Sequence, residues 1–173
     1  MISCSRTDDT RLLFHFNHVI DCNRVLEGSP CSFEKNILIL NGVCEHENPM
    51  QVLLTHCEFF VHIHDMPMNK MNREMASLIG NKLGIFRDVE MDRHGRSWGA
   101  MLRIWVSLEI SKPLKRALKL KSVSGEELLV TFTYESLLNF FYLCGKLGHM
   151  KKYCDSMFME GFKDPGHNTP YGP

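Results

Sequence analysis

The strongest constraint on this fold is an alternating apolar pattern between positions 101 and 110. Every second residue in the run is a large aliphatic: Leu102, Ile104, Val106, Leu108 and Ile110. Successive side chains of a β-strand point to opposite faces, so the pattern predicts a strand with one buried face. Such a strand needs neighbouring strands and a second layer of structure over its apolar face.

Strands and helices are mixed along the rest of the chain. Apolar or β-branched composition predicts further strands over 12–16, 37–40, 58–64, 85–91 and 128–134. The 37–40 segment is an unbroken apolar run, which predicts a buried strand. Helices are predicted over 21–26, with Asp21 near the N-terminal cap, and over 69–83, where apolar residues recur at helical spacing. The order shows no regular strand–helix–strand repeat, so we predict an α+β domain with a small mixed sheet.

The chemistry of the chain centres on sulfur and imidazole ligands near the C-terminus. Cys144, His149 and Cys154 follow the spacing C-x4-H-x4-C, with glycines at 145 and 148. Thiolates and imidazoles suit tetrahedral zinc, and glycine lets the backbone turn tightly around an ion. The pattern therefore predicts Zn²⁺ held by these three side chains. The alternative is a metal-free loop that keeps the spacing without the ion.

This segment resembles the CCHC zinc knuckle, whose full pattern is C-x2-C-x4-H-x4-C. Where that pattern has its first cysteine, this chain has Phe141. Structural zinc sites almost always have four protein ligands, so the substitution predicts a degenerate knuckle. The resemblance implies binding of single-stranded RNA or DNA, in which bases stack on aromatic rings and cations pair with phosphates. The residues available for those contacts are Tyr142, Lys146, Lys151 and Lys152.

A basic stretch precedes the knuckle-like segment. Between Lys112 and Lys152 the chain has eight Lys or Arg residues and three Glu, although the whole sequence has a formal net charge of zero. Local clustering of this kind can neutralise the phosphates of a nucleic acid. The predicted nucleic-acid-binding residues therefore also include Lys112, Lys115, Arg116 and Lys119. The competing interpretation is a solvated edge strand, because lysine is favoured at sheet edges.

Several upstream segments add to this picture. Residues 24–33 read RVLEGSPCSF, and further motifs lie at 54–61, 79–84, 112–116 and 134–140. In this order they resemble a plant domain of unknown function that precedes CCHC knuckles in retrotransposon-derived proteins, although Cys31 stands where the family usually has Trp. The resemblance implies a nucleic-acid-binding protein of a non-LTR retroelement. Family members usually have another strand–helix–strand unit before the position of Leu12, so the resemblance also implies an N-terminally truncated copy.

These observations predict three segments. Residues 12–134 form the α+β domain, in an incomplete ferredoxin-like or RRM-like arrangement; 135–156 form the degenerate knuckle, and 157–173 form a flexible tail rich in Gly and Pro. The N-terminus lacks the apolar core of a signal peptide, and the seven cysteines contain one recognisable spacing, which favours reduced thiols. We therefore expect an intracellular protein, nuclear or cytoplasmic, with no membrane or small-molecule partner.

The sequence has no motif of a common enzyme class. Patterns of the P-loop, G-x-S-x-G and H-E-x-x-H types are absent, so we expect no catalytic residues. A zinc enzyme is the weakest alternative, since three ligands leave a coordination position open. His62, His64 and Asp65 could form a second metal site, and Cys57 with His56 or His62 could act as a nucleophile. The main alternative to nucleic-acid binding is a protein-interaction or remnant domain with a decayed, metal-free knuckle.

Overall fold

The structure, a computed structural model, describes residues 2–7, 11–28, 30–34, 36–95, 97, 99–121, 125–137, 144–147 and 154. The predicted tail over 157–173 lies outside these residues. The elements are β1 (Ile2–Arg6), β2 (Leu12–Phe16), α1 (Val19–Glu27), β3 (Cys31–Phe33), β4 (Asn36–Leu38), β5 (His56–His64), the 3-10 turn η1 (Met68–Lys70), α2 (Arg73–Leu83), β6 (Ile85–Val89), β7 (Leu102–Glu109), β8 (Ala117–Lys121) and β9 (Glu127–Tyr134). Helices combined with antiparallel sheets confirm the α+β prediction.

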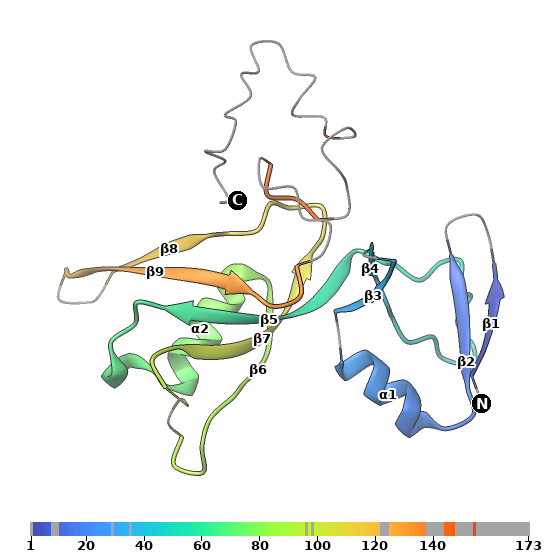
Figure 1. The fold of residues 1–173 in the computed structure, drawn as a ribbon, viewed down its shortest axis with the longest axis horizontal. Helices are drawn as coiled ribbons and strands as arrows, with labels where there is room; N and C mark the ends of the chain where they lie inside the picture. Colours follow the sequence, from blue (N-terminus) through green and yellow to red (C-terminus); the bar gives the residue numbers. More distant parts are fainter. Residues whose placement is uncertain are drawn as a thin grey trace.

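The largest sheet has five strands in the order β6-β7-β5-β9-β8, with every neighbouring pair antiparallel (Figure 1). β6 runs parallel to β5 because β7 lies between them and is antiparallel to both. With α2 as the connection, β5 and β6 form a split β-α-β unit, as in ferredoxin-like sheets. The connection from β7 to β9 contains the edge strand β8, at the position where a ferredoxin-like chain has a second helix.

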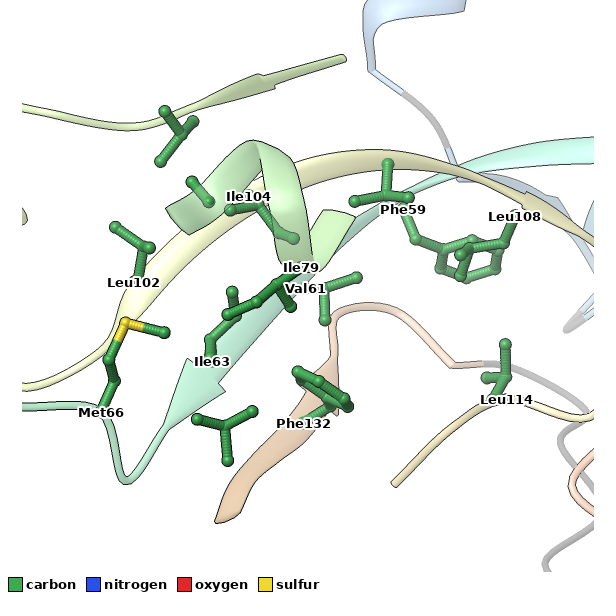
Figure 2. Packing of buried hydrophobic residues seen from close by; sticks show 14 of the residues in the cluster. Phe59, Val61, Ile63, Met66, Ile79, Leu102, Ile104, Leu108, Leu114 and Phe132 are labelled. Carbon is green, nitrogen blue, oxygen red and sulfur yellow. The ribbon is translucent and has the colours of Figure 1, made fainter. Parts of the chain in front are cut away.

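One hydrophobic core lies between α2 and one face of this sheet. The alternation that predicted the strand over 101–110 is confirmed, because Leu102, Ile104 and Val106 are fully buried and Leu108 is 3% exposed. β5 and α2 contribute further fully buried side chains, namely Phe59, Val61, Ile63 and Ile79 (Figure 2). Val130 of β9 is fully buried as well. The sheet therefore has its own core, which fixes the strands that carry the candidate site.

Local chemistry sets both ends of α2. The side chain of Asn72, the N-cap residue, accepts a hydrogen bond from the backbone N–H of Met75 at 2.9 Å. The helix was predicted to begin at residue 69, but residues 68–70 form a 3-10 turn after Pro67. At the other end, a Cβ on Gly84 would lie 2.2 Å from the carbonyl oxygen of Ser107 in β7. The close approach of this turn to β7 therefore requires glycine.

The N-terminal part of the chain is built differently. Its four strands form two separate sheets, β1 with β2 and β3 with β4. None of the described residues between 2 and 38 is buried, and Val19 and Ile20 of α1 are 71% and 67% exposed. Arg11 contacts the loop between β4 and β5, where its Nη1 donates to the backbone carbonyls of Pro49, Met50 and Val52 at 3.0–3.1 Å. This part therefore depends on hydrogen bonds more than on a core.

Two sequence-based predictions for the N-terminal part need correction. The segment over 37–40 was predicted as a buried strand, but β4 pairs only with β3, and Ile37 and Leu38 are half-buried. An apolar run shows that a segment can be buried, but not which partner will cover it. α1 begins at Val19, so Asp21 lies in its first turn, and the N-cap is His18 without a side-chain bond.

Three strands were not predicted at all. β1 and β3 are short, exposed hairpin strands whose apolar content is too low to indicate a strand. β8 falls within the basic stretch, where Leu118 and Leu120 are half-buried and the lysines between and after them are exposed. It lies at the edge of the five-stranded sheet, so the structure confirms the edge-strand interpretation of that part of the stretch.

Candidate nucleic-acid interface

Two of the three predicted zinc ligands lie together. The thiol of Cys154 is within hydrogen-bonding reach of the Cys144 thiol, and Cys154 is 2% exposed. Burial, followed by the neighbouring Cys154 thiol, raises the pKa of Cys144, because both disfavour a thiolate in the absence of a cation. The backbone N–H of Lys146 acts in the opposite direction, donating to the Cys144 sulfur at 3.5 Å. The two thiols are therefore neighbours, as two ligands of a single ion would be.

The loop that carries Cys144 is fixed to the basic stretch. The backbone N–H of Leu114 donates to the carbonyl of Gly145 at 2.8 Å. Gly145 has a φ of +72°, a conformation that favours glycine. Leu114 and Leu147 are 5% and 9% exposed and belong to the hydrophobic cluster of the main sheet. The beginning of the knuckle-like segment is therefore held against the sheet domain.

The donors described at this point fit zinc. Soft sulfur ligands converge, and an amide N–H directed at one sulfur favours its thiolate form. The third predicted ligand, His149, lies outside the described residues, as do the predicted binding residues Tyr142, Lys151 and Lys152. Within the part of the chain that the structure describes, no group of three His, Cys, Asp or Glu side chains is placed to hold a metal. The complete ligand set therefore stays a prediction.

A pocket of about 530 Å³ lies beside the Leu114–Gly145 contact, and Leu114 itself forms part of its wall. Most of the remaining wall comes from the C-terminal end of α2, the end of β7 and the connection toward β8, and the first residues of β5 and β6 and the last residue of β9 complete it. Lys82, Lys112 and Lys115 line the pocket together with one carboxylate, Glu109. The ammonium group of Lys115 donates to the carbonyl of Lys82, and Lys112 pairs with Glu109 at 2.5 Å. Three lysines and one carboxylate leave the pocket positively charged, which favours an anion.

The predicted cations of the basic stretch do not share one surface. Lys112 and Lys115 line the pocket, on the side of the sheet that α2 covers. Lys119 lies on the opposite face of β8, because Leu118 and Leu120 point toward the core. Arg116 is exposed just before β8, and Lys146 is exposed two residues after Cys144. The structure thus places Lys112 and Lys115 near the Cys144 loop and Lys119 apart from them.

Sequence reasoning missed a charged network on the sheet face opposite α2. Arg103 donates to both carboxylate oxygens of Glu135 at 2.7 and 2.9 Å, and to Glu90 at 2.8 Å. The hydrogen bonds from Arg103, and then the bond with His62, lower the pKa of Glu135 to about 2. The ring Nε2 of His62 lies 2.5 Å from the same carboxylate. Glu135 directly follows β9, so this network anchors the chain where it leaves the sheet toward the knuckle-like segment.

An aromatic pair lies on the same face as this network. The rings of Phe60 and Trp105 stack with centroids 6.2 Å apart, and the guanidinium of Arg103 lies 3.6 Å from the Phe60 centroid. Phe60 lies in β5, more than 40 positions before Arg103 and Trp105 of β7. Only the strand register brings them together, so no local sequence pattern could have indicated the group.

The alternative sites weighed from the sequence do not form among the described residues. The prediction that His62 and His64 share a face is confirmed, since their rings stack 6.2 Å apart. However, His64 bonds to Thr133 at 2.8 Å, and the carboxylate of Asp65 accepts a bond from another threonine at 2.6 Å. Burial raises the pKa of Cys57 to about 12, which keeps it a neutral thiol. It is therefore not an activated nucleophile.

A family model described as a zinc knuckle matches residues 108–156. The matched segment begins at the end of β7 and includes the basic stretch, β9 and both converging cysteines. No curated protein and no solved structure matches the chain. The match suggests zinc binding and nucleic-acid binding for this segment, without distinguishing RNA from DNA. Separately, none of the helices in the described ranges is long and apolar enough to cross a membrane.

Proposed function

We propose that this chain binds single-stranded RNA or DNA through its knuckle-like segment and the adjoining basic stretch. The observation that carries the proposal is the meeting of the Cys144 and Cys154 thiols in a loop bonded to Leu114. The bond between Leu114 and Gly145 places residues 144–147 next to the lysines of the pocket. The zinc-knuckle match over residues 108–156 supports the same class of partner.

We propose Zn²⁺ as the cofactor, held by Cys144, His149 and Cys154. Zinc bound by thiolates and imidazole contributes folding energy to small loops, and it requires deprotonated sulfur. In this chain the pKa of the Cys144 thiol is raised, so metal binding should release protons and weaken as the pH falls. Phe141 at the first ligand position leaves three protein donors, which predicts weaker zinc binding than in a four-ligand knuckle.

The chemistry of each residue type indicates its proposed role. Tyr142 would stack on an unpaired base, and Lys146, Lys151 and Lys152 would pair with phosphates. The role is non-enzymatic, since the cysteines serve as structural ligands. The resemblance of the upstream motifs to a plant retroelement-associated domain supports a relationship to the nucleic-acid-binding proteins of such elements.

Zinc content and oligonucleotide binding together test the proposal. We expect the purified chain to contain about one zinc per molecule and to bind a single-stranded oligonucleotide with an affinity that falls steeply with salt. Cys154→Ser should lose the metal and weaken binding, whereas Cys4→Ser, an exposed cysteine in β1, should change neither. Absent binding, or an affinity that does not respond to salt, would contradict the nucleic-acid proposal.

Restoring the missing ligand gives a gain-of-function test. Phe141→Cys creates the full C-x2-C-x4-H-x4-C spacing and should tighten zinc binding, measured by competition with a chelator. The matched control is Phe141→Leu, which removes the aromatic ring without adding a thiol. We expect it to leave the affinity for zinc nearly unchanged. Equal zinc affinity in the two variants would show that the segment does not bind metal as a knuckle does.

A further inference from the structure

We infer that the pocket between α2 and the β7–β8 connection is a subsite for one backbone phosphate, with its sugar, of the strand that the knuckle-like segment binds. The inference rests on the proposed function and gives it a location on the sheet domain. It also adds Lys82, which lies 30 residues before Lys112 and is not among the nucleic-acid-binding residues predicted from the sequence.

Charge is the first argument for an anionic occupant. Lys82, Lys112 and Lys115 line one pocket, and Glu109 is the single acidic residue in its lining. Lys112 takes that carboxylate as its partner at 2.5 Å, and Lys115 is bonded to a backbone carbonyl. Among the described residues, no carboxylate pairs with Lys82. A phosphate in the pocket would lower the repulsion among these cations.

Position is the second argument. Leu114 lines the pocket, and its backbone N–H holds the carbonyl of Gly145, the residue after Cys144. The pocket and residues 144–147 are therefore adjacent, because Leu114 contacts both. Consecutive phosphates of an extended strand are several ångströms apart, so a strand bound at the loop can place a neighbouring phosphate in the pocket. Bases bound at the loop and a phosphate bound at the pocket would then contribute to one continuous interface.

Size and composition are the third argument. A volume of about 530 Å³ is large enough to admit a phosphate with its attached sugar. Asn81 and His56 add polar groups to the wall, and the ring of Tyr134 is held by a bond from its hydroxyl to the carbonyl of Lys115 at 2.5 Å. Such groups can hydrogen-bond to a sugar or phosphate without reading the base, so the subsite should not depend on sequence.

Lys82 is the residue that tests the inference most directly. Lys115 bonds to the end of α2, and Lys112 pairs with Glu109, so replacing either would also remove a contact within the protein. Lys82 offers only its backbone carbonyl to Lys115, and a Lys82→Gln substitution leaves that carbonyl and the helix propensity nearly unchanged. Lys82→Arg keeps the charge. Lys70→Gln, in η1 and outside the pocket, removes an equal charge elsewhere.

The experiment measures the affinity of the full chain for a single-stranded oligonucleotide by fluorescence anisotropy at several salt concentrations. We expect Lys82→Gln to weaken binding and to reduce the slope of log affinity against log salt by about 0.7, the value for one lost phosphate contact on a single strand. Lys82→Arg should keep the wild-type slope, and so should Lys70→Gln. Thermal unfolding and zinc content should be the same in all four proteins.

The possible outcomes separate this inference from the proposed function. If the wild-type chain binds and Lys82→Gln has the same slope as Lys70→Gln, the pocket is not a phosphate subsite and the knuckle proposal stands. If Lys82→Arg loses the contact as well, the effect comes from the shape of the lysine side chain and the phosphate assignment is wrong. If the wild-type chain does not bind any single strand, both the proposed function and the subsite fail.

Discussion

The five-stranded sheet with α2 and the N-terminal part of this chain each combine strands with a helix, but different forces hold them together. The sheet encloses a core with α2, in which Phe59, Ile79 and Ile104 are fully buried. By contrast, α1 has no buried residue, and the two N-terminal hairpins expose most of their side chains. Regular secondary structure alone therefore says little about where the stability of this chain resides.

The difference matters for the candidate site because the site is attached to the sheet. Leu114 and Leu147 extend the core of the sheet toward the Cys144 loop, and Glu135 ties down the chain on the other face. We expect substitutions in the five-stranded sheet and α2 to lower the free energy of unfolding and to weaken nucleic-acid binding. Matched substitutions in the N-terminal part should change both much less. The following substitutions test that expectation in matched pairs.

The largest expected effect comes from removing a buried side chain of the sheet. Ile104 is fully buried in β7, and Ile104→Ala should lower the free energy of unfolding by about 2–5 kcal/mol because it leaves a cavity. The same substitution in α1, at Ile20, which is 67% exposed, should change it by less than about 0.5 kcal/mol. Urea denaturation measures both, and similar losses would mean that α1 is packed in solution.

Adding a methyl group tests the same comparison from the opposite direction. Gly84→Ala should destabilise the chain by about 1–3 kcal/mol, since the new Cβ would meet the Ser107 carbonyl at 2.2 Å. Gly42→Ala adds the same atom where the nearest neighbour, in Leu26, is 4.0 Å away, so its effect should stay within about 0.5 kcal/mol. Thermal unfolding compares the pair. A neutral Gly84→Ala would show that α2 is not held as closely to β7 as the structure has it.

A smaller effect is expected at the helix caps. Asn72→Ala removes the bond to the N–H of Met75 and should cost about 1 kcal/mol. His18, the N-cap of α1, makes no side-chain capping bond, so His18→Ala should be nearly neutral. Helical content measured by circular dichroism through a denaturant titration would distinguish the two. An equal loss from His18→Ala would reveal a cap that the structure lacks.

The smallest effect should appear only as a pH dependence. The pKa of Glu135 is lowered to about 2, so its stabilising contribution is full above the unfolded-state value of about 4.3 and is lost as the pH falls toward 2. Because the Arg103–Glu135 pair is about one-third exposed, we expect less than about 1 kcal/mol from it. The stability difference between wild type and Glu135→Gln should therefore shrink between pH 5 and pH 2.

The control for this measurement lies in the N-terminal half. Glu45 is exposed and forms no ion pair among the described residues. Glu45→Gln should leave the stability unchanged at every pH in this range. If Glu135→Gln behaved in the same way, the Arg103–Glu135 pair would have no role in anchoring the chain after β9.

Much of the sheet could be predicted from the sequence because the information is local. The alternation at Leu102, Ile104 and Val106 identified β7 and its buried face, and β-rich composition identified β5 and β9 to within two residues. The spacing of Cys144 and Cys154 predicted two ligands of one ion; the structure places the two thiols near each other, and their role as ligands stays a prediction. Each of these patterns follows from the period of a strand or the geometry of one ion, so a short segment of sequence contains all the information that the prediction needs.

Tertiary structure alone decided which segments became partners. The 37–40 run is apolar enough for the main sheet but pairs with β3, and the basic stretch supplies an edge strand as well as pocket lysines. Lys82 meets Lys112 and Lys115 because α2 ends beside the connection after β7, and Arg103 meets Glu135 through strand register. Such contacts depend on the free energy of the whole packing arrangement, which no local period encodes. The sequence by itself determined the strands and the ligand spacing, whereas the pocket and the charged network required the folded chain.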